Sequence, residues 1–148
     1  MIRITREPLD AAALLQDFSR DRLETGAVVS FTGLTRSRTG DRIVDTLTLE
    51  AYPGFTDRVM EKIEADARAR FEIQDILAVH RWGAIAVGEP VIFVAVAAAH
   101  RRPAFEAADF LMDHFKTRAP FWKREDGPEG RRWIEPRDQD HADLARWA

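Results

Sequence analysis

Residues 91–102 read VIFVAVAAAHRR, a run of nine apolar residues followed by one histidine and two arginines. Nine residues fall well short of the ~20 that cross a membrane, and a valine-rich run of this length is typical of a buried strand. Pro103 comes next, and proline suits the first turn of a helix because its missing N–H has no partner there. The apolar residues of 104–118 then recur at helical spacing. The pattern therefore predicts a buried strand that leads directly into an amphipathic helix.

This helix is expected to end before Pro120, because proline disfavours helical backbone in the residue before it. Its predicted apolar face consists of Phe105, Ala108, Met112 and Phe115.

Two hairpins are expected upstream of the helix. The stretch IQDILAVHRWG at 73–83 precedes 91–99 across a turn with Gly88 and Pro90, which predicts that these two strands pair. The stretches GAVVSFTG at 26–33 and IVDTLTLEAY at 43–52 flank the charged loop LTRSRTGDR, which suggests a second hairpin with a long loop. Period-two alternation places four residues of 43–52 on one face: Ile43, Leu47, Leu49 and Ala51.

The remaining expected elements are short. A strand is predicted at 2–4, a helix after the capping residue Asp10, and a longer amphipathic helix at 55–71. Strands at 121–125 and 131–135 flank the turn-rich EDGPEG, and a last helix is expected at 138–147. Helices interleaved with hairpin-connected strands favour an α+β fold over a doubly wound parallel sheet. At 148 residues, the chain is expected to form a single domain over 1–148.

Composition excludes several classes of protein. Apolar residues make up 45% and charged residues 32% of the chain, which is typical of a globular protein rather than a disordered one. The net charge of −3 provides no global attraction to nucleic acid or anionic lipid. No signal peptide or membrane span is apparent, which predicts a soluble cytoplasmic protein. Without cysteine or close-set histidines, we expect no disulfide, no metal site and no cysteine nucleophile.

Lysine is used in an unusual way. The chain has 19 arginines but only three lysines, and two of the three fall in DHFKTRAPFWKRE at 113–125, at Lys116 and Lys123. Guanidinium stays protonated, whereas an amine can lose its proton and act as a nucleophile or base. Two ammonium groups brought together, or removed from water, lower each other's pKa toward neutrality. If the chain doubles back at Pro120, both amines can face one pocket.

Three basic clusters lie at expected strand ends: Arg36, Arg38 and Arg42; His80 and Arg81; and His100, Arg101 and Arg102. Of these, the cluster at 100–102 ends the apolar strand and begins a helix, a position that can present side chains and free amides to an anion. The span 100–133 holds eight Lys or Arg against six Asp or Glu, a net of +2. An anion site in this region is therefore consistent with the sequence, although each cluster alone is typical of a solvated loop.

Several motifs together are similar to a known family. They are GAVVSFTGLTR at 26–36, LTLEAYPG at 47–54, VHRWG at 79–83, AHRRPAFEAADFLMD at 99–113, KTRAPFWKRE at 116–125 and EGRRW at 129–133. In this order and over nearly the whole chain, they resemble the large, catalytic subunits of molybdopterin synthase. The resemblance implies an α/β hammerhead fold with an additional antiparallel β element.

The resemblance also implies a reaction and its partners. Members of this family install two sulfurs on cyclic pyranopterin monophosphate, giving the dithiolene of molybdopterin, and need no cofactor. The sulfur arrives as a thiocarboxylate on the C-terminal Gly-Gly of a small ubiquitin-like subunit. Two large subunits form a homodimer within a heterotetramer. By this likeness, the chain is expected to be a sulfurtransferase that binds neither nucleic acid nor membrane.

Site residues follow from the same likeness. Lys116 and Lys123 are the implied catalytic residues, with Lys116 beside the incoming thiocarboxylate and Lys123 in contact with the substrate. The implied substrate-binding residues are Leu34, Thr35, Arg36, His100, Arg101, Lys116, Lys123, Arg124 and Glu125. Thr35 departs from the family pattern, because an apolar residue is expected before the arginine.

Two other functions use the same residues. The chain could be a non-catalytic module that binds anions or RNA, in which case its affinity for nucleic acid falls steeply with salt. It could also be a structural homodimer subunit whose basic ends seat an acidic partner tail without any reaction.

Overall fold

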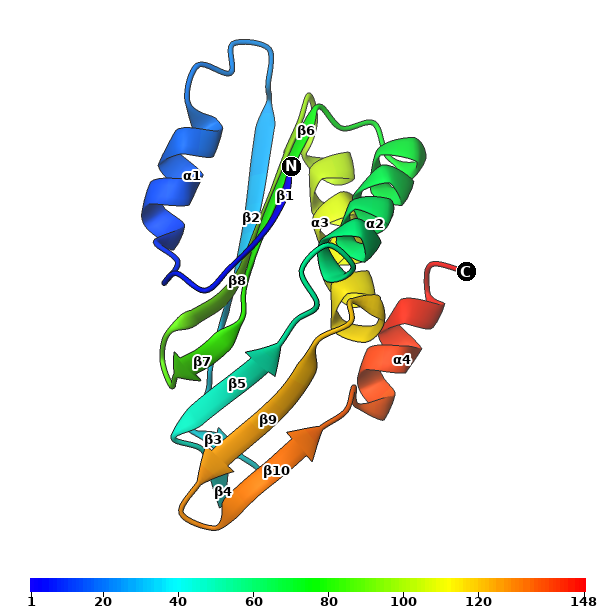
Figure 1. Ribbon diagram of the computed structural model, residues 1–148. Coiled ribbons are helices and arrows are strands. Elements are labelled where there is room, and N and C mark those ends of the chain that lie inside the picture. The colour runs from blue at the N-terminus through cyan, green and yellow to red at the C-terminus, as the bar shows by residue number, and fades with distance from the viewer.

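The computed structural model describes residues 1–148, which form four helices and three sheets (Figure 1). The larger sheet has the order β1 (Ile2–Thr5), β6 (Asp75–Arg81), β8 (Pro90–Ala98) and β2 (Ala27–Leu34). Strands β1 and β6 are parallel, and the other neighbours are antiparallel. None of the helices has the length and hydropathy that crossing a membrane requires.

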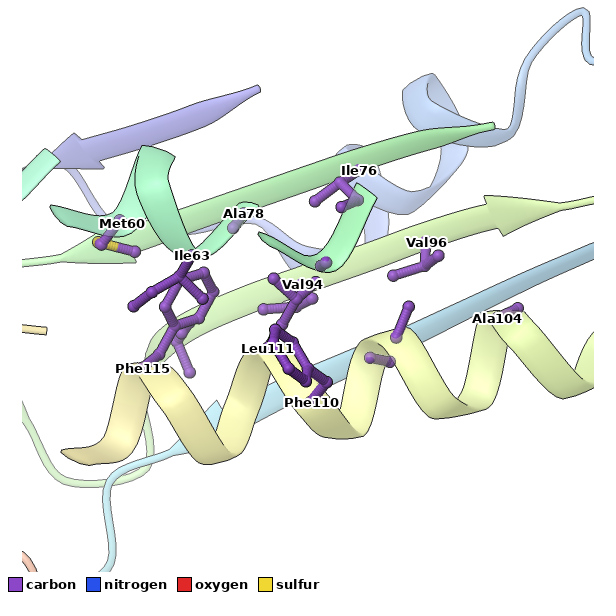
Figure 2. Close-up of a cluster of buried hydrophobic side chains, with 14 of the residues drawn as sticks. Met60, Ile63, Ile76, Ala78, Val94, Val96, Ala104, Phe110, Leu111 and Phe115 are labelled. Carbon is purple, nitrogen blue, oxygen red and sulfur yellow. The ribbon is translucent and has the colours of Figure 1, made fainter. Parts of the chain in front are cut away.

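Strand β8 is the centre of the core. Helices α2 (Thr56–Arg70) and α3 (Arg101–Arg118) cover one face of the sheet, and α1 (Ala11–Ser19) covers the other (Figure 1). Alternate residues of β8 serve the two faces: Ile92, Val94, Val96 and Ala98 pack under α2 and α3, as Figure 2 shows in part, whereas Phe93, Ala95 and Ala97 pack toward α1. Both faces are covered, which explains why the strand is a continuous apolar run.

The second four-stranded sheet has the order β10 (Gly130–Ile134), β9 (Trp122–Gly127), β5 (Thr46–Glu50) and β7 (Gly83–Ala86), all antiparallel. A two-stranded ribbon of β3 (Arg38–Thr39) and β4 (Arg42–Ile43) lies beside it. The last helix, α4 (Asp138–Ala145), follows β10 and packs against α3. The segment 122–145 therefore joins this sheet to α3.

Most predicted elements are confirmed. Strands β6 and β8 pair as an antiparallel hairpin, although β7 intervenes in the connection. The side chain of Asp10 caps α1 by accepting the Ala13 N–H at 3.0 Å. Helix α3 ends at Arg118, before Pro120, and β9 and β10 form the expected hairpin. The α+β fold class is also confirmed.

The predicted hairpin of 26–33 with 43–52 is wrong. Strand β2 pairs with β8 in the larger sheet, whereas β5 pairs with β7 and β9 in the second sheet. The loop between them folds on itself as the β3–β4 ribbon. Ile43 consequently lies in β4, 43% exposed, and does not share a face with Leu47 and Leu49. The register of β2 shifts between Gly33 and Leu34, where the chain leaves the larger sheet.

Three residues of the predicted apolar face of α3 are confirmed, because Ala108 and Phe115 are buried and Met112 packs partly buried against the core, but the fourth is wrong. Phe105 is 59% exposed, and the helix instead buries Ala104, Ala107, Ala108, Phe110, Leu111, His114 and Phe115. The small alanines near the start allow the helix to lie close to β8, which leaves no room there for a phenylalanine ring. Phe105 was therefore assigned to the wrong face.

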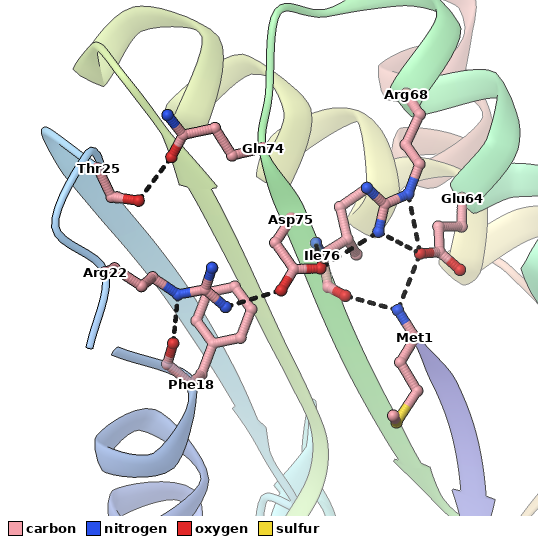
Figure 3. A network of polar contacts seen from close by, with 9 residues as sticks. All are labelled: Met1, Phe18, Arg22, Thr25, Glu64, Arg68, Gln74, Asp75 and Ile76. Carbon is pink, nitrogen blue, oxygen red and sulfur yellow. Dashed lines mark hydrogen bonds and ion pairs between the residues drawn. The ribbon is translucent and has the colours of Figure 1, made fainter. Parts of the chain in front are cut away.

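A polar network lies at the end of the larger sheet that is farther from the second sheet (Figure 1, Figure 3). Asp75 in β6 accepts hydrogen bonds from Arg22 at 2.7 Å and from Arg68 of α2 at 3.3 Å. Burial alone would raise the pKa of Asp75, but the bonds from Arg22, the Ile76 N–H and Arg68 hold it below its usual value. These ion pairs connect the segment after α1 to β6 and α2 at the rim of the core.

Candidate functional site

A cavity of about 1100 Å³ lies where the two sheets meet. Its walls come from the end of β2 and the loop after it, the last turns of α3, the strands β5, β9 and β10, and the start of α4. Pockets that bind small molecules commonly measure roughly 300–1,000 Å³, so this one has room for a sizeable ligand. The cavity is thus formed by segments that are far apart in the sequence.

Lys116 and Lys123 both line this cavity. Lys116 is exposed in the last turn of α3, and Lys123 is half-buried near the start of β9. Between them, the buried Thr56 hydroxyl donates to the carbonyl oxygen of Pro120 at 3.2 Å, which fixes the turn. The chain therefore doubles back at Pro120 and brings the two amines to one cavity.

The environment of Lys123 changes its proton affinity. Burial and then the positive charge of Lys116 lower the pKa of Lys123 to about 8, although the negative charge of Asp140 acts to raise it. A lysine with an ordinary pKa of about 10.4 is almost fully protonated at neutral pH, whereas a pKa of about 8 leaves roughly a tenth of the amine neutral at pH 7. A neutral amine can act as a base or a nucleophile.

His80 and Phe121 form an apolar wall of the cavity. Their rings stack with centroids 4.0 Å apart and an interplanar angle of 19°. Burial lowers the pKa of His80 to about 3 despite the 2.9 Å hydrogen bond between Nδ1 and the Arg81 carbonyl oxygen. Because a carbonyl oxygen only accepts, Nδ1 carries the proton of the neutral ring. His80 therefore contributes a neutral surface rather than a cation.

Glu125 is buried in the cavity wall and already has two partners. One carboxylate oxygen accepts from Arg132 at 3.2 Å, and the other accepts from the hydroxyl of Thr39. Because Thr39 belongs to β3, Glu125 connects the ribbon after β2 to β9 and β10. The carboxylate therefore holds together segments of the wall.

Arg124 lies on the opposite face of β9 from Lys123 and Glu125. Its guanidinium donates to Asp126 at 3.2 Å and lies 5.7 Å from the centre of the Trp133 ring. It is not among the residues that line the cavity. Alternation along the strand explains this separation from its two neighbours.

Leu34, Thr35 and Arg36 all line the cavity. Leu34 and Arg36 are exposed, whereas Thr35 is buried and its hydroxyl lies 2.7 Å from the Ala86 carbonyl oxygen and 3.1 Å from that of Glu89. This hydroxyl explains why threonine stands where an apolar residue was expected. It fixes the end of β2 against β7, and the backbone next to Arg36 is thereby held in place.

His100 and Arg101 lie elsewhere. Both are exposed at the N-terminal end of α3, with His100 as its N-cap, and neither lines the cavity. Arg101 and Lys116 are 15 residues apart on this helix, which corresponds to roughly 23 Å along its axis at ~1.5 Å per residue. Within one chain, the structure does not bring this pair to the lysines.

The residues that line the cavity and were not singled out as site residues in the sequence include Phe31, Arg132, Arg137 and Asp140. At the start of α4, the carboxylate of Asp140 accepts from the backbone N–H of the N-cap residue Arg137 at 2.9 Å. An Asp three residues into a helix is a common capping pattern, and no spacing in the sequence connects it to lysines on other elements. Only the folded chain brings these residues together.

The sequence matches the profile of the family described as "MoaE protein" over residues 4–118. The chain belongs to this family. It is 52% identical to a molybdopterin synthase catalytic subunit of Caulobacter vibrioides over 147 residues, which cover 99% of this chain and 97% of the relative. The resemblance inferred from the motifs is confirmed.

Solved structures agree with this membership. The chain superposes with a TM-score of 0.83 on the molybdopterin biosynthesis MoaE protein from Burkholderia ambifaria, at 39% identity, covering 99% of this chain and 97% of that one. The TM-score is 0.81 for the molybdopterin synthase from Staphylococcus aureus, at 27% identity, covering 88% and 94%. The MoaE fold is therefore preserved along the whole chain, including the segments after residue 118 that carry Lys123.

Proposed function

We propose that this MoaE protein is the catalytic subunit of a molybdopterin synthase, a sulfurtransferase of molybdenum cofactor biosynthesis. The observation that carries the proposal is the pair of amines, Lys116 and Lys123, in one cavity of a chain that has no cysteine of its own. Such a chain can receive sulfur only from outside. The relative from Caulobacter vibrioides, which matches over 97% of its length, is named as a molybdopterin synthase catalytic subunit, and this name supports the same reaction.

The substrate is cyclic pyranopterin monophosphate, and the sulfur donor is the thiocarboxylate of a small ubiquitin-like subunit ending in Gly-Gly. Both are anions, and the cavity contains the cations Arg36, Lys116, Lys123, Arg132 and Arg137. Each transfer breaks the carbon–sulfur bond of one thiocarboxylate and forms one carbon–sulfur bond on the pterin precursor. Water supplies the oxygen that turns the acyl group of the spent tail into a carboxylate, and two tails are consumed for each dithiolene.

The two lysines have different tasks in this reaction. The exposed Lys116 attracts the incoming thiocarboxylate as a cation, and the half-buried Lys123 contacts the substrate. With a pKa of about 8, Lys123 exchanges protons readily near neutral pH, which suits a general acid and base or a transient nucleophile. Arg36 holds the phosphate from the rigid end of β2.

His100 and Arg101 enter the site from a second copy of the chain. Each lies too far along α3 to reach the lysines of its own chain, so their role in anion binding requires the homodimer. Leu34 and Glu125 complete the proposed set in the cavity, with Glu125 holding the wall in place, whereas Arg124 on the opposite face of β9 stays outside it. The dimer carries one small subunit at each end, which gives a heterotetramer.

The catalytic assignment is tested by a single-turnover assay with the thiocarboxylated partner. Loss of the thiocarboxylate is followed by intact mass, and dithiolene formation is followed in the pterin. Lys123→Arg should lower the rate by about 10²-fold or more, the usual contribution of an acid or base, and Lys116→Ala should also lower it by removing the cation that attracts the thiocarboxylate. Lys62→Ala, which removes the only other lysine, should retain the wild-type rate. Wild-type turnover by both site variants would refute the assignment.

The dimer contribution is tested by mixing two inactive proteins. A dimer of Lys123→Ala with His100→Ala holds one site that has both residues and one that lacks both. If His100 serves the partner's site, mixing should restore transfer. If mixing restores nothing while subunit exchange is demonstrated by mass, His100 does not act across the dimer.

The RNA-binding alternative has no support among the relatives. The cations proposed to bind the substrate line a cavity rather than a strip of exposed surface. Phe121 already stacks on His80, so its ring is not free to stack on a base. Absence of RNA binding at low salt would eliminate it.

A further inference from the structure

Asp140 is a buried carboxylate in the wall of the lysine cavity. It lies in the first turn of α4, is only 8% exposed and lines the same cavity as Lys116 and Lys123. Its two oxygens accept from the backbone N–H of Arg137 at 2.9 Å and from Nη2 of the same residue at 3.1 Å. Figure 1 shows how α4 lies beside the end of α3, where Lys116 is located. The terminal helix thus brings a negative charge to the amines.

The other carboxylates of the cavity are placed differently. Glu125 is occupied by Arg132 and the hydroxyl of Thr39, and Glu135 is exposed to solvent. The remaining charged or titratable groups that line the cavity are Arg36, His80, Arg132 and Arg137, and His80 is neutral. Asp140 is also paired with an arginine, but it lies on α4, which packs against α3, the helix that carries Lys116, and its charge acts on both lysines.

The charges of these groups act on one another in a consistent way. Burial raises the pKa of Asp140, but the bonds from Arg137 and the charge of Lys116 lower it to below its usual value, so the carboxylate stays ionised. The same carboxylate acts to raise the pKa of Lys123, whereas burial and the charge of Lys116 lower it. Without it, two ammonium groups would face each other in a partly desolvated space, which is unfavourable.

We propose that Asp140 is a positioning residue for the lysine pair: its carboxylate, buried in the wall of the cavity that both amines line, offsets the repulsion between Lys116 and Lys123. This proposal deepens the proposed sulfur-transfer function and rests on it for its role in catalysis. The electrostatic part concerns only the folded chain. Asp140 itself does not touch the reacting atoms.

The electrostatic part is tested by labelling the lysines with a small amine-reactive anhydride between pH 6 and 10, using peptide mass to follow each lysine. Asp140→Asn keeps an acceptor for the Arg137 N–H but removes the charge. Lys123 should then lose its proton at lower pH, and its labelling at pH 7 should be about threefold faster, as expected for half a pKa unit. Unchanged labelling of Lys123 over the whole range would overturn the proposal.

Three further variants separate charge from structure. Asp138→Asn removes an exposed carboxylate from the same first turn of α4 and should leave the labelling profile of Lys123 unchanged. Asp140→Glu keeps the charge and should restore the wild-type profile. Asp140→Ser is a second neutral variant that keeps a hydroxyl acceptor, so the proposal stays testable if Asp140→Asn fails to fold. Wild-type labelling in Asp140→Ser would also overturn it.

The role in catalysis has a separate readout. In the sulfur-transfer assay, the acidic limb of the pH–rate profile of Asp140→Asn should move to lower pH, whereas loss of a merely structural contact would lower the rate equally at every pH. If wild-type protein transfers no sulfur, the proposed function fails, yet the labelling experiment still decides whether Asp140 controls Lys123. The two failures are therefore distinguishable.

Discussion

The two four-stranded sheets of this MoaE protein place their charges in opposite ways. In the larger sheet, β8 is buried on both faces by apolar side chains, and the ion pairs around Asp75 lie at the rim. In the second sheet, β9 turns Lys123 and Glu125 into a cavity, with Asp140 buried nearby. Burying charges is costly unless they are paired, so a fold retains such groups mainly where they serve a purpose. The larger sheet holds the main apolar core, and the second sheet forms much of the wall of the charged cavity.

The largest effect on stability is expected from the core of the larger sheet. Phe93→Ala removes a side chain that is 1% exposed on β8, and it should lower the free energy of unfolding by about 3–5 kcal/mol. Phe105→Ala is the matched control, because that ring is 59% exposed on α3 and its loss should cost less than about 0.5 kcal/mol. Urea denaturation measures both. Equal losses would contradict the placement of the apolar core around β8.

Acid should destabilise the wall between the sheets through His80. The unfolded chain takes up this proton near pH 6.5, but the folded chain does so only near its pKa of about 3. The stability contributed by neutral His80 is therefore complete above pH 6.5 and is lost as pH falls toward 3. The loss should reach about 2 kcal/mol at pH 5 relative to pH 8. His80→Phe, which keeps a ring against Phe121, should show a smaller loss; an identical pH dependence would argue against this origin.

Thr35→Val tests how much the contact between the end of β2 and β7 contributes to stability. This nearly isosteric change removes the hydroxyl that bonds to the carbonyl oxygens of Ala86 and Glu89, and it should cost about 1 kcal/mol. Thermal unfolding provides the measurement. A stabilised variant would mean that an apolar residue suits this position better and that the hydroxyl is dispensable.

The smallest effect is expected at the third lysine. Lys62 is 68% exposed on α2, where it pairs with Asp66 one turn away. Lys62→Met should change the free energy of unfolding by less than about 0.5 kcal/mol, as usual for exposed helix pairs. Turnover should be unchanged. A large loss of activity would contradict the account, because it would show that a lysine outside the cavity is also needed for turnover.

Sequence reasoning succeeded where the deciding pattern is local. The apolar run 91–99, the breaker Pro120 and the cap Asp10 each specify their own element, and all three elements are present. The scarcity of lysine singled out Lys116 and Lys123, which the fold brings to one cavity, and their catalytic role stays a prediction. Family motifs supplied the hammerhead architecture.

Reasoning from the sequence failed where distant segments compete. Strands β2 and β5 are neighbours in sequence, but β2 finds a longer partner in β8, and no local pattern reveals that choice. Phe105 obeys helical spacing, yet the alanines around it set how the helix packs. Asp140 resembles an ordinary cap, and its relation to Lys123 exists only after α4 has packed against α3.

The state of the Lys123 amine is the most direct test of the division between a sheet that holds the apolar core and one that lines a charged cavity. With only three lysines, protein labelled with ¹³C at the lysine ε-carbon gives three signals, which single substitutions assign. Titration by NMR should show Lys123 losing its proton with a pKa of about 8. A titration midpoint at the ordinary lysine value of about 10.4 would contradict the account, because the second sheet would then hold no activated amine.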